Sequence, residues 1–281
     1  MRRATTIVLA LLLGACSRET ATEPVPPLVD AAWLRTHRDD VVLVDMQSSR
    51  ELYEKGHVEG AVHAEVDDFR DEKKNLAPVA ELERKLGELG VDRDTHVVAY
   101  DELYGRHAGW LWYVLHQLGH ERVSLLDGGM DGIELVAGPP PGPASVRYEA
   151  RKFPTDVVDA KWVEEHLGRA VFLDVRPDEQ YTGKKPKEGM KPGHLPGAIS
   201  VPWTAFRGPG NRYLDPAAAE KLLAGVPKDE EVVLYCNSYH QAAHVHFQLV
   251  RLGYRNLKAF DGSMKEWLED PQRPLQTGRE P

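Results

Sequence analysis

The sequence Glu231-Val-Val-Leu-Tyr-Cys-Asn-Ser-Tyr-His-Gln241 joins a short apolar run to a segment with helical spacing. The run Glu231–Tyr235 predicts a buried strand, and Gln241–Leu252 predicts a helix. Cys236 lies in the turn between them and is one of only two cysteines in the chain. A thiol in such a turn lies among backbone N–H groups at the positive end of a helix dipole, and this setting favours the nucleophilic thiolate.

The same series of segments occurs twice along the chain. The corresponding pairs are Val41–Asp45 with Ala170–Asp174, Gly56–Ala61 with Gly193–Ala198, Val97–Asp101 with Val232–Cys236, and Leu126–Met130 with Phe260–Met264. The paired segments lie 129 to 137 positions apart, which indicates one repeated module. Asp101 in the first copy takes the place of Cys236 in the second.

Strands alternate with helical segments in both copies, a pattern that favours a mostly parallel sheet flanked by helices. The predicted helices are Asp30–Arg38, Val79–Leu89 and Gly109–Gln117 in the first copy, and Asp159–Leu167, Pro216–Leu223 and Gln241–Leu252 in the second. We therefore predict an α/β fold with two similar domains. Sites in parallel sheets form beyond the carboxyl ends of the strands, which is where Cys236 lies.

The length of the chain bears on the number of domains, and its charge bears on the kind of partner. A chain of 281 residues is long enough for two domains, which we expect at residues 28–137 and 152–270. The linker at 138–151 contains the proline-rich run Gly138–Pro143, and residues 271–281 form a tail. The formal charge of −9 and the lack of a basic helix argue against nucleic-acid binding. We expect no cofactor and no bound metal.

Residues 1–15 resemble the signal peptide of a bacterial lipoprotein. They contain two arginines near the start and an apolar run, Ile7–Leu13, that is too short to cross a bilayer of about 30 Å. The run ends in Leu13-Gly-Ala-Cys16, which resembles a lipobox; an ordinary signal peptide is the alternative. We expect Cys16 to carry lipid, residues 16–27 to form a tether, and the protein to be anchored on the periplasmic side of a bacterial envelope membrane.

Four features of the second copy resemble the tandem rhodanese-like sulfurtransferases, the thiosulfate and 3-mercaptopyruvate sulfurtransferase family. In chain order they are Asp174-x-Arg176 after a strand, Gly193–Ala198, the strand–Cys236–loop–helix turn, and Asp261–Trp267. The resemblance covers nearly all of residues 28–270. It implies two rhodanese-like domains, of which the C-terminal one is catalytic and the N-terminal one inactive.

The resemblance also implies a reaction. Cys236 would take a sulfane sulfur from a small anionic donor, thiosulfate or 3-mercaptopyruvate, as a persulfide and pass it to a thiol or to cyanide. Donor binding would fall to Arg176 and to the loop residues Asn237, Ser238, Tyr239, His240 and Gln241. Because Asp101 forms no persulfide, we expect the first copy to be a scaffold, with Arg106 or His107 facing the cleft.

The loop after Cys236 departs from the family's patterns, because it has neither a basic residue for thiosulfate nor the small residues typical for mercaptopyruvate. Gln180 stands where relatives have a second arginine. We expect His240 to supply positive charge below about pH 6.5 and so to strengthen a weak thiosulfate activity. The lysine-rich segment Lys184–Lys191 is a second source of charge, or else a plain surface loop. Tyr239 is expected to narrow the pocket.

Three alternative interpretations stay open. A phosphatase of this fold needs an arginine six residues after its cysteine, and Ala242 stands there. A metal site would use Cys236, His240 and His244, but no fourth ligand is nearby in the sequence. A non-enzymatic persulfide carrier or thiol-binding module would retain Cys236 without turning over small donors.

Overall fold

The computed structural model describes residues 24–280. The expected signal peptide, the expected lipid site at Cys16 and most of the tether lie outside the described residues. Within the described part, the helices are all too short or too polar to cross a membrane.

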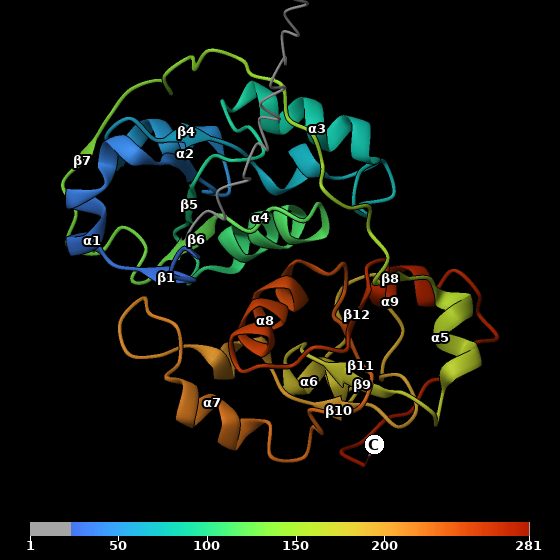
Figure 1. The fold of residues 1–281 in the computed structure, drawn as a ribbon. Coiled ribbons are helices and arrows are strands. Elements are labelled where there is room, and N and C mark those ends of the chain that lie inside the picture. Colours follow the sequence, from blue (N-terminus) through green and yellow to red (C-terminus); the bar gives the residue numbers. More distant parts are fainter. Residues whose placement is uncertain (1–23, 281) are drawn as a thin grey trace, which may run out of the picture.

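Each copy forms a five-stranded parallel sheet, so the expected α/β fold with two similar domains is confirmed (Figure 1). The strand order is β1-β6-β5-β2-β4 in the first copy, and the corresponding order in the second is β8-β12-β11-β9-β10. The first sheet contains β1 (Leu28–Val29), β2 (Val42–Asp45), β4 (Val62–His63), β5 (Val97–Tyr100) and β6 (Val123–Leu126). The second contains β8 (Val157–Val158), β9 (Val171–Asp174), β10 (Ile199–Ser200), β11 (Val232–Tyr235) and β12 (Leu257–Phe260). A separate antiparallel pair joins β3 (His57–Val58) to β7 (Leu135–Val136).

The helices also recur in equivalent places. The first copy contains α1 (Ala31–Thr36), α2 (Arg50–Lys55), α3 (Val79–Glu88) and α4 (Arg106–Gln117), with 3-10 turns η1 (Arg38–Asp40) and η2 (Val66–Phe69). The second contains α5 (Ala160–His166), α6 (Asp178–Tyr181), α7 (Pro216–Leu222), α8 (His240–Arg251) and α9 (Ser263–Trp267), with the 3-10 turn η3 (Trp203–Phe206). α1 and α5 begin alike, because the carboxylates of Asp30 and Asp159 each accept the N–H three residues later.

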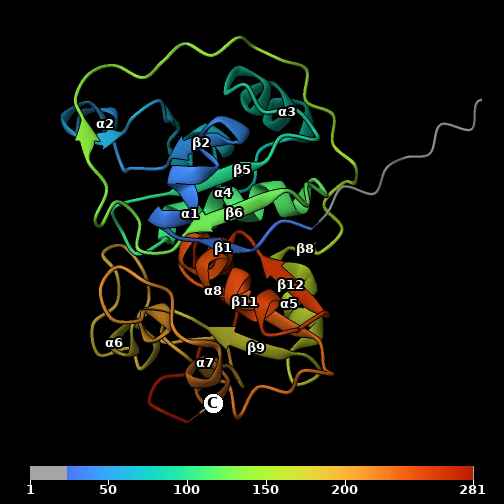
Figure 2. The same ribbon diagram turned by 60° about the vertical axis from the view of Figure 1, so that its left-hand side comes forward.

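The two copies pack through α4 and α8, which lie face to face between the two sheets (Figure 2). Gly109 permits a close approach, since a Cβ there would lie 3.0 Å from the Cα of His244. Three residues further along, the rings of Trp112 and Phe247 are 5.1 Å apart. Both pairs are 135 positions apart, which is the offset between the copies in this region. Each helix therefore meets its own counterpart.

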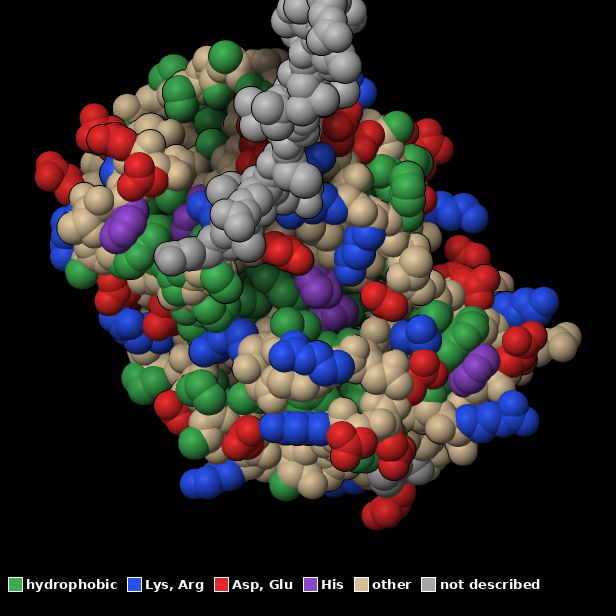
Figure 3. Space-filling view, viewed as in Figure 1, with side chains coloured by type: hydrophobic (Ala, Val, Ile, Leu, Met, Phe, Trp, Pro, Cys, Tyr) green, Lys and Arg blue, Asp and Glu red, His purple; other side chains and the backbone are tan. Residues whose placement is uncertain are grey.

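The largest hydrophobic core extends across both copies, and its buried side chains include Trp110, Tyr113, Tyr239 and Phe247. Hydrophobic and histidine side chains follow the seam between the copies on one face, and charges of both signs surround it (Figure 3). Because the core is shared, the two domains form one packed body, and a loop in one copy can be completed by a residue from the other.

Candidate active site

Cys236 directly follows β11 and is held from behind by α9. The hydroxyl of Ser263 accepts the N–H groups of Cys236 and Tyr239, at 3.1 Å and 3.2 Å, and donates to the carbonyl of Phe260 at 2.9 Å. The N–H of Met264 donates to the carbonyl of Cys236 at 3.1 Å. The side chain of Cys236 is only 1% exposed. The Asp-Gly-Ser-Met motif thus fixes the backbone of the cysteine loop.

The loop after Cys236 presents backbone N–H groups. Tyr239 has a left-handed backbone with φ 61°, which turns the chain into α8. The N–H groups of Ser238, Gln241 and Ala242 make no hydrogen bond with another residue of the described chain. They lie at the N-terminal end of a 12-residue helix, where unpaired amides and the helix dipole favour an anion. The loop therefore offers an anion site next to the thiol.

The guanidinium of Arg176, which we expected to bind the donor, is occupied by partners within its own domain. Its guanidinium makes an ion pair with Asp174, with an Nη2–Oδ2 distance of 2.6 Å, and Nε donates to both carboxylate oxygens. Nη2 also donates to the carbonyl of Gly193 at 2.8 Å. Both charged side chains are almost completely buried. Because a buried aspartate needs such a partner, Arg176 is occupied in holding the end of β9.

The side chains of Asn237 and Tyr239, which we also expected to bind the donor, contact other residues of the protein. Asn237 donates from Nδ2 to Oε1 of Gln180 at 2.9 Å, so the residue that replaces the family's second arginine supports the loop. The ring of Tyr239 is fully buried against Tyr113, and its hydroxyl is 2.9 Å from Nδ1 of His246. The expectation that this ring narrows the pocket is wrong, because it lies in the core between the copies. Only its backbone belongs to the loop.

His240 begins α8 and its ring meets the ring of His107 edge-on, with centroids 5.8 Å apart. Burial, followed by the positive charges of Arg70 and Arg106, holds the pKa of His240 well below its usual range. His240 is therefore neutral at and below neutral pH, and the expected cationic role near pH 6.5 is wrong. The remaining loop residue, Gln241, is half-buried with its Oε1 unpaired among the described residues.

The positive charge near Cys236 comes from the first copy instead. Arg70, just after η2, donates from Nη2 to the carbonyl of Ser238 at 2.5 Å. Arg106, the first residue of α4, lies 5.6 Å from the ring centre of Trp203. The charges of both guanidinium groups act on Cys236. The sequence named Arg106 as a candidate for the cleft but missed Arg70, whose place follows only from the packing of the two copies.

The loop of the first copy is already filled by an anion of its own. The carboxylate of Asp101 accepts the N–H groups of Leu103 and Gly105 on Oδ1, at 2.7 Å and 2.8 Å. On Oδ2 it accepts those of His107 and Ala108, at 2.5 Å and 2.9 Å. Asp101 therefore caps α4 and starts this helix at Arg106, three residues before the predicted start.

The structure supports neither a metal site nor a phosphatase loop among the described residues. The ring of His244 stacks on Tyr213 and its Nδ1 lies 3.2 Å from the carbonyl of Gly105, so it does not converge with His240. No cluster of three or more potential metal ligands occurs within residues 24–280. Ala242 is fully buried, at the position where a phosphatase loop would need its arginine.

The lysine-rich segment is exposed. Lys185 pairs with Glu179 at 3.6 Å. Lys187 is near enough for its charge to lower the pKa of His240, after the larger effects of burial and of the two arginines. The segment thus contributes a weak, screened positive field at the rim of the loop.

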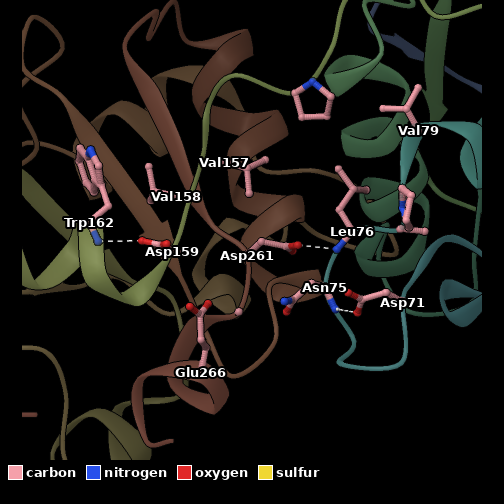
Figure 4. A pocket seen from close by; sticks show the side chains of 14 residues that line it. Asp71, Asn75, Leu76, Val79, Val157, Val158, Asp159, Trp162, Asp261 and Glu266 are labelled. Carbon is pink, nitrogen blue, oxygen red and sulfur yellow. Dashed lines mark hydrogen bonds between the residues drawn. The ribbon is translucent and has the colours of Figure 1, made fainter. Parts of the chain in front are cut away.

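A large pocket of the described residues lies away from Cys236. It measures about 690 Å³, lies between the two copies, and is lined by apolar side chains such as Leu76 and Trp162 and by four carboxylates (Figure 4). One of these, Asp261, accepts the N–H of Leu76, and burial raises the pKa of Asp261 to about 7. The carboxylates make this pocket less suited to an anion than the cysteine loop with its unpaired amides.

Comparison with known proteins agrees with this architecture. The Rhodanese-like domain family matches residues 29–135 and again residues 159–270. The chain belongs to the rhodanese family. A 3-mercaptopyruvate sulfurtransferase of Escherichia coli is 31% identical, over 85% of this chain and 94% of the relative. The sulfur carrier protein TtuD of Thermus thermophilus is 30% identical, over 90% of this chain and 97% of the relative.

Among solved structures, the rhodanese fold of this chain is similar to that of SseA from Escherichia coli, described as a 3-mercaptopyruvate sulfotransferase. The TM-score is 0.76 at 27% sequence identity, over 85% of this chain and 99% of the other. The match extends through both domains, so the tandem arrangement of the rhodanese modules is shared as well.

Proposed function

We propose that this rhodanese-family protein moves a sulfane sulfur from a small anionic donor to a thiophilic acceptor through a persulfide on Cys236. The protein is a sulfurtransferase, as its relatives are named. The observation that carries the finer proposal is the loop itself. A single thiol lies at the end of β11, beside unpaired amides of Ser238, Gln241 and Ala242, with two arginines of the first copy nearby.

The first half-reaction loads the cysteine. The Cys236 thiolate attacks the outer sulfur of thiosulfate, the S–S bond breaks, and sulfite leaves with the bonding electron pair. With 3-mercaptopyruvate the C–S bond breaks instead, and the pyruvate enolate that leaves takes up a proton. Either donor produces a persulfide anion, which the loop amides and the helix dipole stabilise.

The second half-reaction transfers the outer sulfur of the persulfide to the acceptor. A thiolate or cyanide attacks the terminal sulfur of the persulfide, the persulfide S–S bond breaks, and the electron pair returns to Cys236 as thiolate. In each step the attacking group supplies the electron pair of the new bond and the leaving group keeps that of the broken bond, so no external oxidant or reductant is needed. Because His240 is held neutral, we expect no rise in thiosulfate activity from its protonation across roughly pH 5.5 to 8.

Mass spectrometry of protein treated with thiosulfate or 3-mercaptopyruvate tests the proposal. We expect the mass of one sulfur atom to be added on the peptide that carries Cys236 and to be lost after cyanide is added. Cys236→Ser should show neither the addition nor turnover. Wild-type turnover by Cys236→Ser would refute the assignment of the nucleophile.

A non-enzymatic persulfide carrier is the second candidate, because a relative of similar length is named a sulfur carrier protein. Cys236 is almost completely buried, which would protect a stored persulfide. The two functions differ in rate: an enzyme shows many turnovers with cyanide and a small donor, whereas a carrier loads once and discharges only to its protein partner.

We also propose that the protein is lipid-anchored at Cys16 in the cell envelope of a bacterium, from the lipobox-like sequence Leu13–Cys16. A single acyl chain binds membranes only weakly, so bacterial lipoproteins carry more than one. Cys16→Ser should therefore move the protein from the membrane fraction to the soluble fraction, or block its processing. A wild-type protein that is already soluble after cell disruption would exclude the anchor.

A further inference from the structure

We propose that Arg70, a residue of the inactive copy, is the cation that binds the oxyanion of the donor at the Cys236 loop. The inference rests on the proposed sulfur transfer and deepens it by naming a specificity-determining residue outside the catalytic domain. It makes the anion site a joint product of both copies.

The position of Arg70 is fixed by contacts on two sides. Nη2 donates to the carbonyl of Ser238, two residues after Cys236. The guanidinium carbon lies 4.5 Å above the ring centre of Trp110, so the planar group is stacked on an aromatic face. Nε is buried and has no hydrogen-bond partner within the described residues. A guanidinium held at one nitrogen with another donor unused is suited to receive an anion.

The charge of Arg70 is not neutralised by a close carboxylate. Asp67 is paired with Lys74 at 2.8 Å, and Asp71 accepts the N–H of Asn75. Asp261, the remaining carboxylate that acts on Arg70, accepts the N–H of Leu76. No ion pair that includes Arg70 occurs between residues 24 and 280. Arg176, the third arginine whose charge acts on Cys236, is by contrast fully paired.

The second copy provides the matched counterpart. Arg70 and Arg207 each form an isolated bridge, to Leu76 and to Tyr213, and both bridges are six positions long and 137 positions apart. Arg207 reaches into the opposite loop, where its guanidinium carbon lies 3.3 Å from the ring centre of Tyr104. Each copy therefore sends an arginine to the loop of the other. Only Arg70 reaches a loop with a thiol and unpaired amides.

Each of the two bridges is held by an aspartate of the opposite copy. The N–H of Tyr213 donates to Asp127 at 2.8 Å, and the N–H of Leu76 donates to Asp261. Asp127 and Asp261 occupy the same place in the repeat, just after β6 and β12. The same construction thus delivers Arg70 and Arg207, which makes Arg207 a control for any general effect of removing an arginine from the domain interface.

The test measures anion binding at Cys236 without requiring sulfur transfer. Iodoacetamide is neutral and alkylates the thiol, and sulfite, the leaving group of thiosulfate, should slow this reaction by occupying the loop. For Arg70→Ala we expect the sulfite concentration that halves the rate to rise roughly 10- to 100-fold, the effect of losing a charged hydrogen bond. Arg207→Ala should change it less than about twofold, and Arg70→Lys should restore part of the protection.

Arg70→Gln separates binding from loop support, because its amide can still donate to the Ser238 carbonyl but carries no charge. We expect it to behave like Arg70→Ala toward sulfite, with protection expressed relative to the alkylation rate of each variant without sulfite. Equal protection in wild type, Arg70→Ala and Arg70→Gln would overturn the inference. If no donor loads wild-type Cys236 with sulfur, the proposed function fails, yet the sulfite titration still decides the role of Arg70.

Discussion

The loop after β5 and the loop after β11 occupy the same place in two copies of one module, but they treat negative charge in opposite ways. In the first copy, the Asp101 carboxylate accepts four backbone N–H groups. In the second, Cys236 replaces it, and amides at the start of α8 make no hydrogen bond with other residues of the described chain. A loop built for an anion can therefore be closed by its own side chain or left open for a ligand.

Cys236→Asp tests the equivalence of the two loops most directly, because it puts the residue of the first copy into the second. Sulfur transfer should fall to background, because a carboxylate cannot form a persulfide. The new carboxylate should accept the loop amides as Asp101 does, so the unfolding midpoint should be at least as high as that of Cys236→Ser. Enzyme assays and thermal unfolding check both parts. A midpoint well below that of Cys236→Ser would show that the two loops are not equivalent.

In the first copy, Asp101→Ala leaves four N–H groups without their acceptor. We expect the free energy of unfolding to fall by about 2–4 kcal/mol, as for the loss of a helix cap together with buried unpaired donors. Urea denaturation measures this fall. Asp101→Asn, which keeps one acceptor oxygen, should lose less stability and leave sulfur transfer per folded molecule near the wild-type value. A loss of activity as complete as that of Cys236→Ser would refute the scaffold role of the first copy.

The sequence predicts the fold more completely than it predicts the site. The repeat and the alternation of strands and helices fixed the domain architecture, since those signals are local and occur twice. The cysteine loop followed from the same order of segments. Arg70 could not be found this way, because its partner Ser238 is 168 positions distant and only the packing of α4 on α8 brings them together.

Two site residues have surroundings in the structure that the sequence did not predict, for physical reasons. Arg176 was assigned to the donor, but Asp174 is buried two residues earlier and takes the guanidinium as its partner. A charge at a strand end that points into the protein should have indicated this pairing. His240 was expected to become cationic, but the burial of the loop and the arginines of the other copy hold it neutral. Neither the burial nor those neighbours is visible in one stretch of sequence.

A smaller effect is the pH dependence of stability that comes from His244 of α8, which packs against α4. Burial lowers the pKa of His244 to about 4, with further lowering by nearby arginines. Because the unfolded chain binds this proton near pH 6.5, stability is lost as the pH falls below that value, by about 2 kcal/mol between pH 7 and pH 5. Asp261, with its pKa raised to about 7, acts in the opposite direction over the same range.

The contribution of His244 is therefore measured as a difference. Urea unfolding of wild type and His244→Gln at pH 7 and at pH 5 should show that wild type loses about 2 kcal/mol more than the variant on acidification. Equal losses would mean that His244 does not stay neutral in the folded protein.

The smallest effect concerns the contact between the two helices. Gly109→Ala adds a Cβ that lies 3.0 Å from the backbone of His244, so one helix must shift. Overpacking costs about 1–3 kcal/mol, and the higher helix propensity of alanine returns up to about 1 kcal/mol, which leaves a loss of roughly 1 kcal/mol in thermal or urea unfolding. Gly225→Ala, where the Cβ meets nothing within 4 Å, is the control and should be close to neutral.

The contacts of Gly109 with His244 and of Trp112 with Phe247 have a consequence for how such a chain arises. A residue that touches its own counterpart lies on a two-fold rotation axis, and a symmetric homodimer has an interface of this kind. The exchange of Arg70 and Arg207 between the loops follows the same rotation. The tandem chain thus has the geometry of a dimer whose subunits have been fused, in which one subunit has lost its nucleophile and still supplies its arginine to the other.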